Sequence, residues 1–247
     1  MLPNANLVPE ERIVAELRKI KSPAEQALLR RAALCADAAL TAAVVTIKRR
    51  GTTEREVCAE GYAAGLRAGA DFVRYIRVHS GLWSAAGSRW PQAMNRTIQR
   101  GEVVALDAIG AYQGYQFDVN RTTTAGPTDA ERLALLETVL EATSRAVEAC
   151  VAGSMVGAIA EAAIEVAGKS PFANALGPMM GHGIGLETVE LPYVQAGDQS
   201  LLEPGMALCI EPGIFIPGWA GASIEVEVLI QPAGGPEIIT PTPGRLW

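Results

Sequence analysis

Apolar residues recur at helical spacing in two long stretches of the chain, and each stretch is introduced by a helix-capping signal. The first begins at residues 22–25 (SPAE) and continues to Gly51, and the second begins at residues 128–131 (TDAE) and continues to Gly153. In such a capping box, a Ser or Thr side chain and a Glu three residues later satisfy backbone amides that the first turn leaves unpaired. The two patterns therefore predict two long amphipathic helices.

Shorter signals follow each long helix. A second helix is expected after each one, at about residues 53–68 and 156–167, and residues 53–56 (TERE) form a further capping box. The apolar run at residues 103–106 (VVAL) predicts a short buried strand. The alternation at residues 224–228 (IEVEV) predicts a half-buried one.

The two halves of the chain repeat this order with similar spacing. Asp107 and Asp118 lie 85 and 96 residues after Ser22, whereas Glu211 and Glu225 lie 83 and 97 residues after Thr128. Two helices followed by a carboxylate-bearing hairpin, occurring twice, indicate an internal duplication. We therefore predict one catalytic domain over residues 22–247, with halves at about 22–126 and 127–247. Residues 1–21 are expected to be an approach segment or linker.

The composition excludes several classes of protein. A chain that is 49% hydrophobic and 19% charged is typical of a folded globule. A net charge of -6 argues against nucleic acid as a partner, because binding phosphate requires clustered Lys and Arg. No signal peptide or membrane-spanning run is apparent, and the four cysteines are widely scattered. We expect a cytoplasmic protein without a membrane partner.

Two aspartates follow the first predicted strand. Asp107 comes directly after the apolar run, and Gly110 and Gly114 suit a turn region before Asp118. This interval can place both carboxylates on neighbouring antiparallel strands. Acids at such a spacing are usually exposed turn residues. Here, however, a charge directly after a buried strand would be costly unless it were neutralised.

A histidine stands in a glycine-rich turn at residues 181–185 (GHGIG). His182 is one of only two histidines in the chain. A lone histidine is usually structural, for example a hydrogen-bonded core residue. The flanking glycines instead leave room for another group to approach this ring, and the turn has no apolar face to bury.

Two glutamates complete the set. Glu211 ends an apolar run as Asp107 does, and Glu225 lies in the alternating strand. Four carboxylates and an imidazole on one sheet would repel one another unless cations neutralised them. This donor set suits a pair of divalent ions, Mn²⁺, Co²⁺, Fe²⁺ or Zn²⁺, with a water as nucleophile. Cys209 should face the same side of its strand as Glu211, and we expect it to serve in packing.

With these residues in order, the sequence resembles the superfamily of creatinase, prolidase, aminopeptidase P and methionine aminopeptidase. The family hairpin is similar to residues 107–122, its G-H-G-I-G-L turn to residues 181–186, and its I-E-P-G-I strand to residues 210–214. The Glu of its final R-I-E motif falls on Glu225. The match is closest to the Xaa-Pro peptidase and creatinase branch, because residues 20–25 (IKSPAE) resemble the junction after that branch's N-terminal domain.

The resemblance implies the duplicated pita-bread fold, an α/β (α+β) structure in which two pairs of helices cover a curved antiparallel sheet. Asp107 and Glu211 would each bind chiefly one metal ion. Asp118 and Glu225 would bridge the two ions, and His182 would cap the second. The family's equivalent of Glu211 is proposed to accept a proton from the nucleophile. Mn²⁺ or Co²⁺ would be the first choice of metal.

The sequence departs from the family pattern at several positions. The chain begins almost at that junction, so we expect a fragment or a naturally short form without the branch's N-terminal domain, which helps to build the dimer; a homodimer is left open. The histidine that assists the leaving amine is replaced by Val189, and a second one is missing from residues 88–92 (SRWPQ). Ser223 stands at the Arg position before the last ligand. His79 could supply part of the missing imidazole function or be a hydrogen-bonded strand-end residue. Trp90 is expected to narrow the pocket.

Three functions follow as hypotheses. The first is a dinuclear metal-dependent hydrolase that resembles Xaa-Pro aminopeptidase or dipeptidase and acts on a short peptide. The second is a relative of creatinase, ectoine hydrolase or dimethylsulfoniopropionate lyase that breaks a C–N or C–S bond in a small polar molecule. The third is a non-catalytic binding module, which the complete set of five ligands disfavours.

Overall fold

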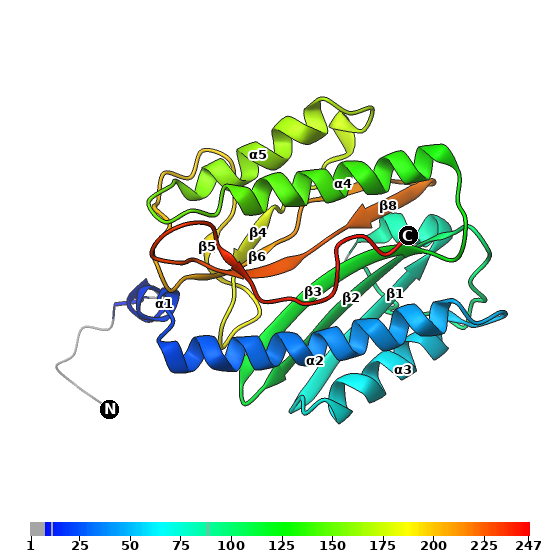
Figure 1. Cartoon of the computed structure of the whole chain (residues 1–247), viewed down its shortest axis with the longest axis horizontal. Coiled ribbons are helices and arrows are strands. Elements are labelled where there is room, and N and C mark those ends of the chain that lie inside the picture. The colour runs from blue at the N-terminus through cyan, green and yellow to red at the C-terminus, as the bar shows by residue number, and fades with distance from the viewer. Residues whose placement is uncertain (1–7, 11, 88) are drawn as a thin grey trace.

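The computed structural model of the protein describes residues 8–10, 12–87 and 89–247 (Figure 1). Its helices are α1 (Arg12–Lys19), α2 (Pro23–Ile47), α3 (Glu54–Arg67), α4 (Ala130–Glu148) and α5 (Val156–Gly168), with 3₁₀ turns η1 (Gly81–Ala86) and η2 (Ala173–Ala175). Its strands are β1 (Phe72–Ser80), β2 (Val103–Tyr112), β3 (Tyr115–Thr124), β4 (Gly181–Gly183), β5 (Glu190–Tyr193), β6 (Ala207–Ile210), β7 (Gly213–Ile216), β8 (Ala220–Ser223), β9 (Val226–Leu229) and β10 (Glu237–Ile238).

The first half is an antiparallel sheet of β1, β2 and β3 with α2 and α3 packed along one side (Figure 1). Leu106 and Ala108 of β2 and Phe117 of β3 are fully buried in the core under these helices. A two-residue turn, Gln113–Gly114, joins β2 to β3, and both residues have positive φ angles of 47° and 82°. Such a turn matches the twist of the strands that it joins and sets their register.

The second half repeats the plan with smaller strands. Its sheet has the order β10-β9-β6-β4-β5, and β7 and β8 form a separate pair. α4 and α5 lie on the opposite side of the molecule from α2 and α3 (Figure 1). Leu208 and Ile210 of β6 and Val226 and Val228 of β9 are buried in the core that these strands share with α4 and α5. Each half therefore has one sheet face under helices and one face turned inward.

The inward faces meet where β3 lies against β8 and β9. The amide of Glu225 donates to the backbone oxygen of Asn120 at 3.0 Å, and the Thr122 hydroxyl donates to that of Ser223 at 2.8 Å. The carboxylate of Glu227 accepts the Asp118 amide at 2.8 Å. These bonds join the two halves close to the predicted ligands.

The capping boxes at Ser22 and Thr53 are confirmed, because each side chain accepts the amide of the Glu three residues later and that Glu accepts the cap amide. The prediction of a capping box at residues 128–131 was wrong. Asp129 caps α4 by accepting the Arg132 amide at 2.8 Å, and the Thr128 hydroxyl donates to Gly101 instead. Asp is as good an N-cap as Thr, so the helix begins one residue later than predicted.

Two strand details also differ from the predictions. Residues 224–228 do not form one half-buried strand, because β8 ends at Ser223, β9 begins at Val226, and Glu225 and Glu227 are fully buried. The reason is that β3 covers the side that the alternation assigned to solvent. Gly110 lies inside β2 and not in a turn. A Cβ added there would lie 2.4 Å from the Phe117 ring, so the glycine permits close packing.

The described part of the predicted approach segment contains a helix and is bonded to the second half of the chain. Residues 12–19 form α1, Arg18 and Lys21 both form ion pairs with the buried Glu190, and the Lys21 amide donates to Gly205. This end of the described chain is therefore anchored to the second half.

None of the described helices is both long and apolar enough to cross a bilayer.

Candidate metal centre

The β2–β3 hairpin carries two of the predicted ligands on its inward face. Leu106 and Ala108 point into the core under α2, so Asp107 between them points the opposite way. Asp118 lies opposite Ile109, two residues from Asp107, which makes the two carboxylates diagonal neighbours on one face. Both are largely buried.

The other three predicted ligands come from separate segments of the second half. His182 is in β4, Glu211 directly follows β6, and Glu225 lies between β8 and β9. β4 pairs with β6 so that His182 is opposite Cys209, two residues before Glu211. Antiparallel pairing therefore places the imidazole and the Glu211 carboxylate side by side.

The fold brings all five side chains together. Nε2 of His182 lies 3.2 Å from Oε1 of Glu211 and 3.9 Å from Oδ2 of Asp118. It lies 4.0 Å from Oε1 of Glu225. Carboxylate oxygens of Asp107, Asp118 and Glu225 lie within 4.8 Å of one another. Glu225 thus stands in the middle of the cluster.

His182 presents a ring nitrogen to the carboxylates. Its Nδ1 lies 3.0 Å from the backbone oxygen of Gly183 and donates to it, so in the neutral ring Nε2 carries the lone pair. Burial acts to lower the pKa of His182, but hydrogen bonding and attraction to Glu211 outweigh it and raise the pKa. Nε2 among these oxygens therefore requires a proton or a metal ion.

The carboxylates of the cluster also require protons or metal ions. Burial, opposed by Arg77 and aided by Glu211, raises the pKa of Asp107 to about 6. Burial and repulsion from the neighbouring carboxylates raise the pKa values of Asp118 and Glu225 well above their ordinary range. Without a cation, the cluster reduces its charge by keeping protons.

Among the described residues, several buried oxygens at the site lack a hydrogen-bond donor. Within the described part of the chain, Oδ1 of Asp107, Oδ1 of Asn120 and Oε1 of Glu225 accept no hydrogen bond. A buried acceptor without a donor costs roughly 1–3 kcal/mol, and a divalent cation would satisfy such oxygens. The five side chains offer several oxygens, one imidazole nitrogen and no thiolate, which fits divalent ions such as Mn²⁺ or Co²⁺.

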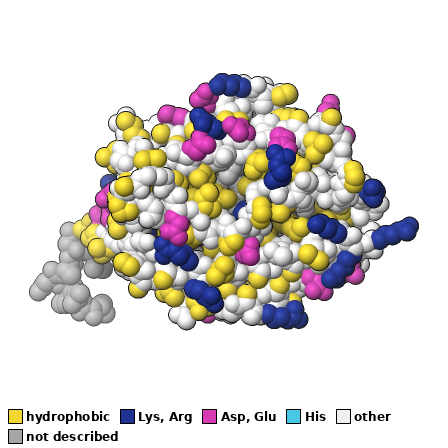
Figure 2. Space-filling view, in the orientation of Figure 1, with side chains coloured by type: hydrophobic (Ala, Val, Ile, Leu, Met, Phe, Trp, Pro, Cys, Tyr) yellow, Lys and Arg dark blue, Asp and Glu magenta, His cyan; other side chains and the backbone are white. Residues whose placement is uncertain are grey.

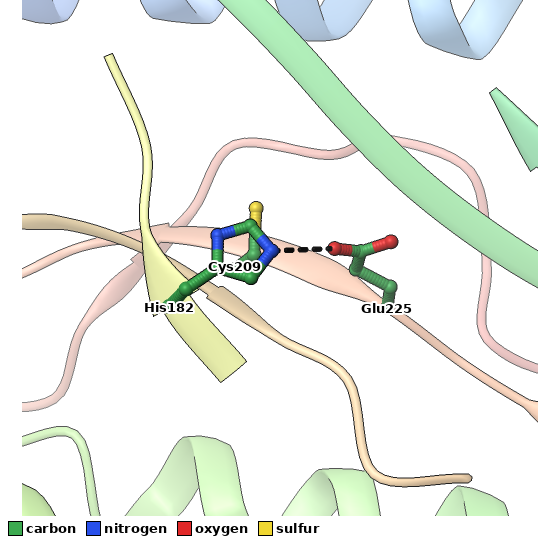
Figure 3. A group of neighbouring side chains, drawn as sticks. All are labelled: His182, Cys209 and Glu225. Carbon is green, nitrogen blue, oxygen red and sulfur yellow. Dashed lines mark ion pairs between the residues drawn. The ribbon is translucent and has the colours of Figure 1, made fainter. Parts of the chain in front are cut away.

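Cys209 lies beside the cluster, and Figure 3 shows it next to His182 and Glu225. Its thiol is fully buried and donates to the backbone oxygen of Asp118 at 3.7 Å. Burial, aided by the surrounding carboxylates, raises its pKa well above the ordinary value. Only the thiolate is a good ligand, so these surroundings favour the packing role expected from the sequence.

Arg77 contacts one of the predicted ligands and lines the cavity, and the sequence reasoning missed it. It lies opposite Asp107 in the β1–β2 register, and its Nη1 forms an ion pair with Oδ2 of Asp107. The guanidinium also lies 4.6 Å from the ring centroid of Tyr75. The available signal was an arginine between two apolar strand residues, Ile76 and Val78.

Glu227 was also missed, although it lies in the alternating segment already noticed. It is fully buried, it accepts the Asp118 amide, and its Oε2 has no hydrogen-bond partner in the described part of the chain. Burial raises its pKa to about 8. Glu227 holds the backbone of a predicted ligand without joining the cluster.

His79 borders the same cavity from β1. Its Nε2 lies 2.9 Å from the backbone oxygen of Pro91, and its ring packs edge-on against Trp83 at 5.5 Å. Burial lowers its pKa. These contacts anchor the ring to the loop that follows η1, and the proton-shuttling role of His79 stays a prediction.

A cavity of about 430 Å³ opens onto the cluster. All five predicted ligands line it, together with His79, Arg77, Arg74, Val189 and Phe215. Val189 therefore does border the site, and its side chain is 44% exposed. The prediction that Trp90 narrows the pocket was wrong, because this residue is 72% exposed and lies outside the lining. Ser88, in the same stretch, lies outside the described residues.

The fold and the site define a class: duplicated α/β proteins with a carboxylate–imidazole centre suited to divalent metal ions. The chain belongs to metallopeptidase family M24, whose model matches residues 27–232. The Xaa-Pro dipeptidase of Pyrococcus furiosus is 33% identical over 224 residues. That match covers 90% of this chain and 63% of the relative, so the chain spans less than two thirds of that relative's length.

Solved structures agree with this assignment. The Xaa-Pro dipeptidase from Bacillus anthracis superimposes with a TM-score of 0.91 at 34% identity, covering 98% of this chain and 67% of the other. The X-Pro aminopeptidase from Thermotoga maritima gives 0.89 at 29% identity, covering 96% and 66%. The predicted pita-bread fold is confirmed.

Proposed function

We propose that the protein is a metal-dependent hydrolase of short peptides or peptide-like amides, with two divalent ions held by Asp107, Asp118, His182, Glu211 and Glu225. The observation that carries the proposal is the convergence of these side chains on one buried face, with the His182 nitrogen turned toward the carboxylates. The names of the dipeptidase and aminopeptidase relatives support a peptide as substrate.

The distances between the side-chain atoms indicate how the five residues would be divided between the two ions. One ion would lie among Asp107, Asp118 and Glu225, whose oxygens are mutually within 4.8 Å. The other would lie at His182 and Glu211, with Asp118 and Glu225 shared between the two. Bound ions would polarise the amide carbonyl and lower the pKa of a water molecule.

Glu211 is the proposed general base. Its side chain is 24% exposed, compared with 10% for Asp118 and 2% for Glu225, so it has the best access to the cavity. Its carboxylate would accept a proton as the water oxygen bonds to the amide carbon. The same proton would pass to the nitrogen as the C–N bond breaks.

The cavity is large enough for a dipeptide-sized molecule, since ligand sites of about 300–1,000 Å³ hold small molecules. Met179, Val189 and Phe215 supply apolar surface, and Arg74 and Arg77 supply positive charge. A substrate with an apolar group and a carboxylate would suit this lining.

The proposal also includes a cytoplasmic location. The four cysteines of the described chain are free, which fits a reducing compartment.

The test is turnover by chelated protein reloaded with Mn²⁺ or Co²⁺. Xaa-Pro dipeptides should be cleaved, and Glu211→Gln should bind the metal without cleaving them. The hydrolase proposal fails if metal-loaded protein turns over neither these peptides nor amidino and N-acyl amino acids.

A second candidate is a non-peptidase enzyme that acts on a small polar molecule. It is favoured by Val189, an apolar residue at the cavity wall where the resemblance places a histidine. The Val189→His variant separates the two candidates. A weakened peptidase should gain Xaa-Pro cleavage, whereas a small-molecule enzyme should stay inactive on peptides and lose native turnover.

A further inference from the structure

A fixed positive charge already occupies one end of the ligand cluster. Arg77 and Asp107 face each other across β1 and β2, and both are only 8% exposed. The guanidinium forms an ion pair with Oδ2 of Asp107 and lies over the ring of Tyr75. Packing on two sides holds the charge in this place.

The ligand cluster therefore has a different nitrogen-bearing side chain at each end, Arg77 beside Asp107 and His182 beside Glu211. At the other end, His182 lies beside Glu211 and Asp118 and offers them a ring nitrogen that is also able to bind a metal ion. A guanidinium is a cation and has no lone pair to offer a metal. His182 can thus join a metal ion, whereas Arg77 can only compete with one.

Asp107 is where that competition occurs. One of its oxygens is bound to Arg77, and Oδ1 has no hydrogen-bond partner in the described part of the chain. A divalent ion on Asp107 would lie within a few ångströms of the guanidinium, and two cations at such a distance in a buried site repel strongly.

We propose that Arg77 competes with a metal ion for Asp107 and so weakens metal binding at the position that Asp107 serves. The position at Asp107 fills only when the guanidinium gives up its ion pair. Arg77 acts through Asp107 and is a positioning residue. The inference rests on the proposed metal centre.

Metal titration of the whole chain tests this inference. Chelated protein is titrated with Mn²⁺ by calorimetry, with free Mn²⁺ followed by electron paramagnetic resonance. The parent should bind one ion tightly and a second at least about 10-fold more weakly. Arg77→Gln removes the charge and should strengthen the second binding step about 10-fold or more, with the first step changed less than about 3-fold.

Arg74→Gln is the matched control. Arg74 lies on the same strand and lines the same cavity, but its guanidinium forms no ion pair with Asp107. It should leave the ratio of the two affinities unchanged. If Arg77→Gln does not fold, Arg77→Lys replaces it in the test. Lysine keeps the positive charge but lacks the planar fork, so it should strengthen the second metal-binding step by less than the roughly 10-fold expected of Arg77→Gln.

The outcomes separate the two proposals. If the parent binds two ions and Arg77→Gln leaves the second affinity within 2-fold, or weakens it, the competition is refuted and the metal centre stands. An equal effect of Arg74→Gln also refutes it, because general cavity charge then explains the result. If no variant binds Mn²⁺, both proposals fail.

Discussion

Replacing Glu227 by Gln should change the pH dependence of stability in a predictable direction. Glu227 is fully buried, its Oε1 accepts the Asp118 amide at 2.8 Å, and burial raises its pKa to about 8. A glutamine keeps an acceptor for that amide and has nearly the same shape. The substitution therefore removes the ionisation and preserves the hydrogen bond.

The sign follows from the two pKa values. Unfolded, this carboxyl titrates near its ordinary 4.5, and folded it titrates near 8. Between these values the folded protein holds the extra proton, so the stability of the parent falls as pH rises. Each pKa unit is worth about 1.4 kcal/mol. Integrated from pH 5 to 8, this linkage costs the parent about 3–4 kcal/mol that Glu227→Gln avoids.

The assay is urea unfolding of metal-free protein at pH 5, 6, 7 and 8. Asp107, Asp118 and Glu225 titrate in both proteins, so their effects largely cancel in the difference between variant and parent, apart from the repulsion that Glu227 adds to Asp118. That difference should be small at pH 5 and grow in favour of the variant. Glu237→Gln is a control without a pH trend, because hydrogen bonding to Arg30 lowers the pKa of Glu237 and its effect on stability therefore changes only below about pH 5. A difference for Glu227→Gln that stays constant within about 1 kcal/mol would refute the reasoning.

Three further predictions concern the proposed site. Asp118→Ala should bind metal poorly and lose activity, so added Mn²⁺ should raise the Tm of the parent much more than that of the variant. Equal shifts would exclude a bridging role. Glu211→Gln should keep most of its metal and lose about 10²–10⁴ in kcat, since it removes a general base. A parent-like kcat with full metal content would remove Glu211 from that role. His79→Ala should lower kcat and alter its pH profile if His79 moves protons. If His79 only packs against Trp83 and Pro91, the Tm should fall with kcat nearly unchanged.

The sequence by itself determined the secondary structure near both helix pairs and the set of candidate ligands. The capping boxes at Ser22 and Thr53 were readable because their hydrogen bonds connect residues three apart. The four candidate carboxylates were readable because the duplicated order of apolar run and carboxylate recurs at matched spacing, and His182 was readable from its glycine-rich turn. Local signals of this kind do not depend on what lies across the fold.

The tertiary structure alone decided which groups surround those ligands. Arg77 reaches Asp107 only through the β1–β2 register, and sequence spacing of 30 residues does not encode that register. The same holds for Glu227, which alternation assigned to a half-buried strand. Burial of Glu227 depends on β3 crossing from the other half of the chain, more than 100 residues away.

The break between β8 and β9 at Glu225 has the same origin. Alternating residues predicted a continuous strand at 224–228, but the amide of Glu225 pairs with Asn120 on β3 and lies between β8 and β9. A side chain's face follows from its own strand, because the pleat alternates locally. Its partners follow from long-range packing of the two halves, which the local pattern does not contain.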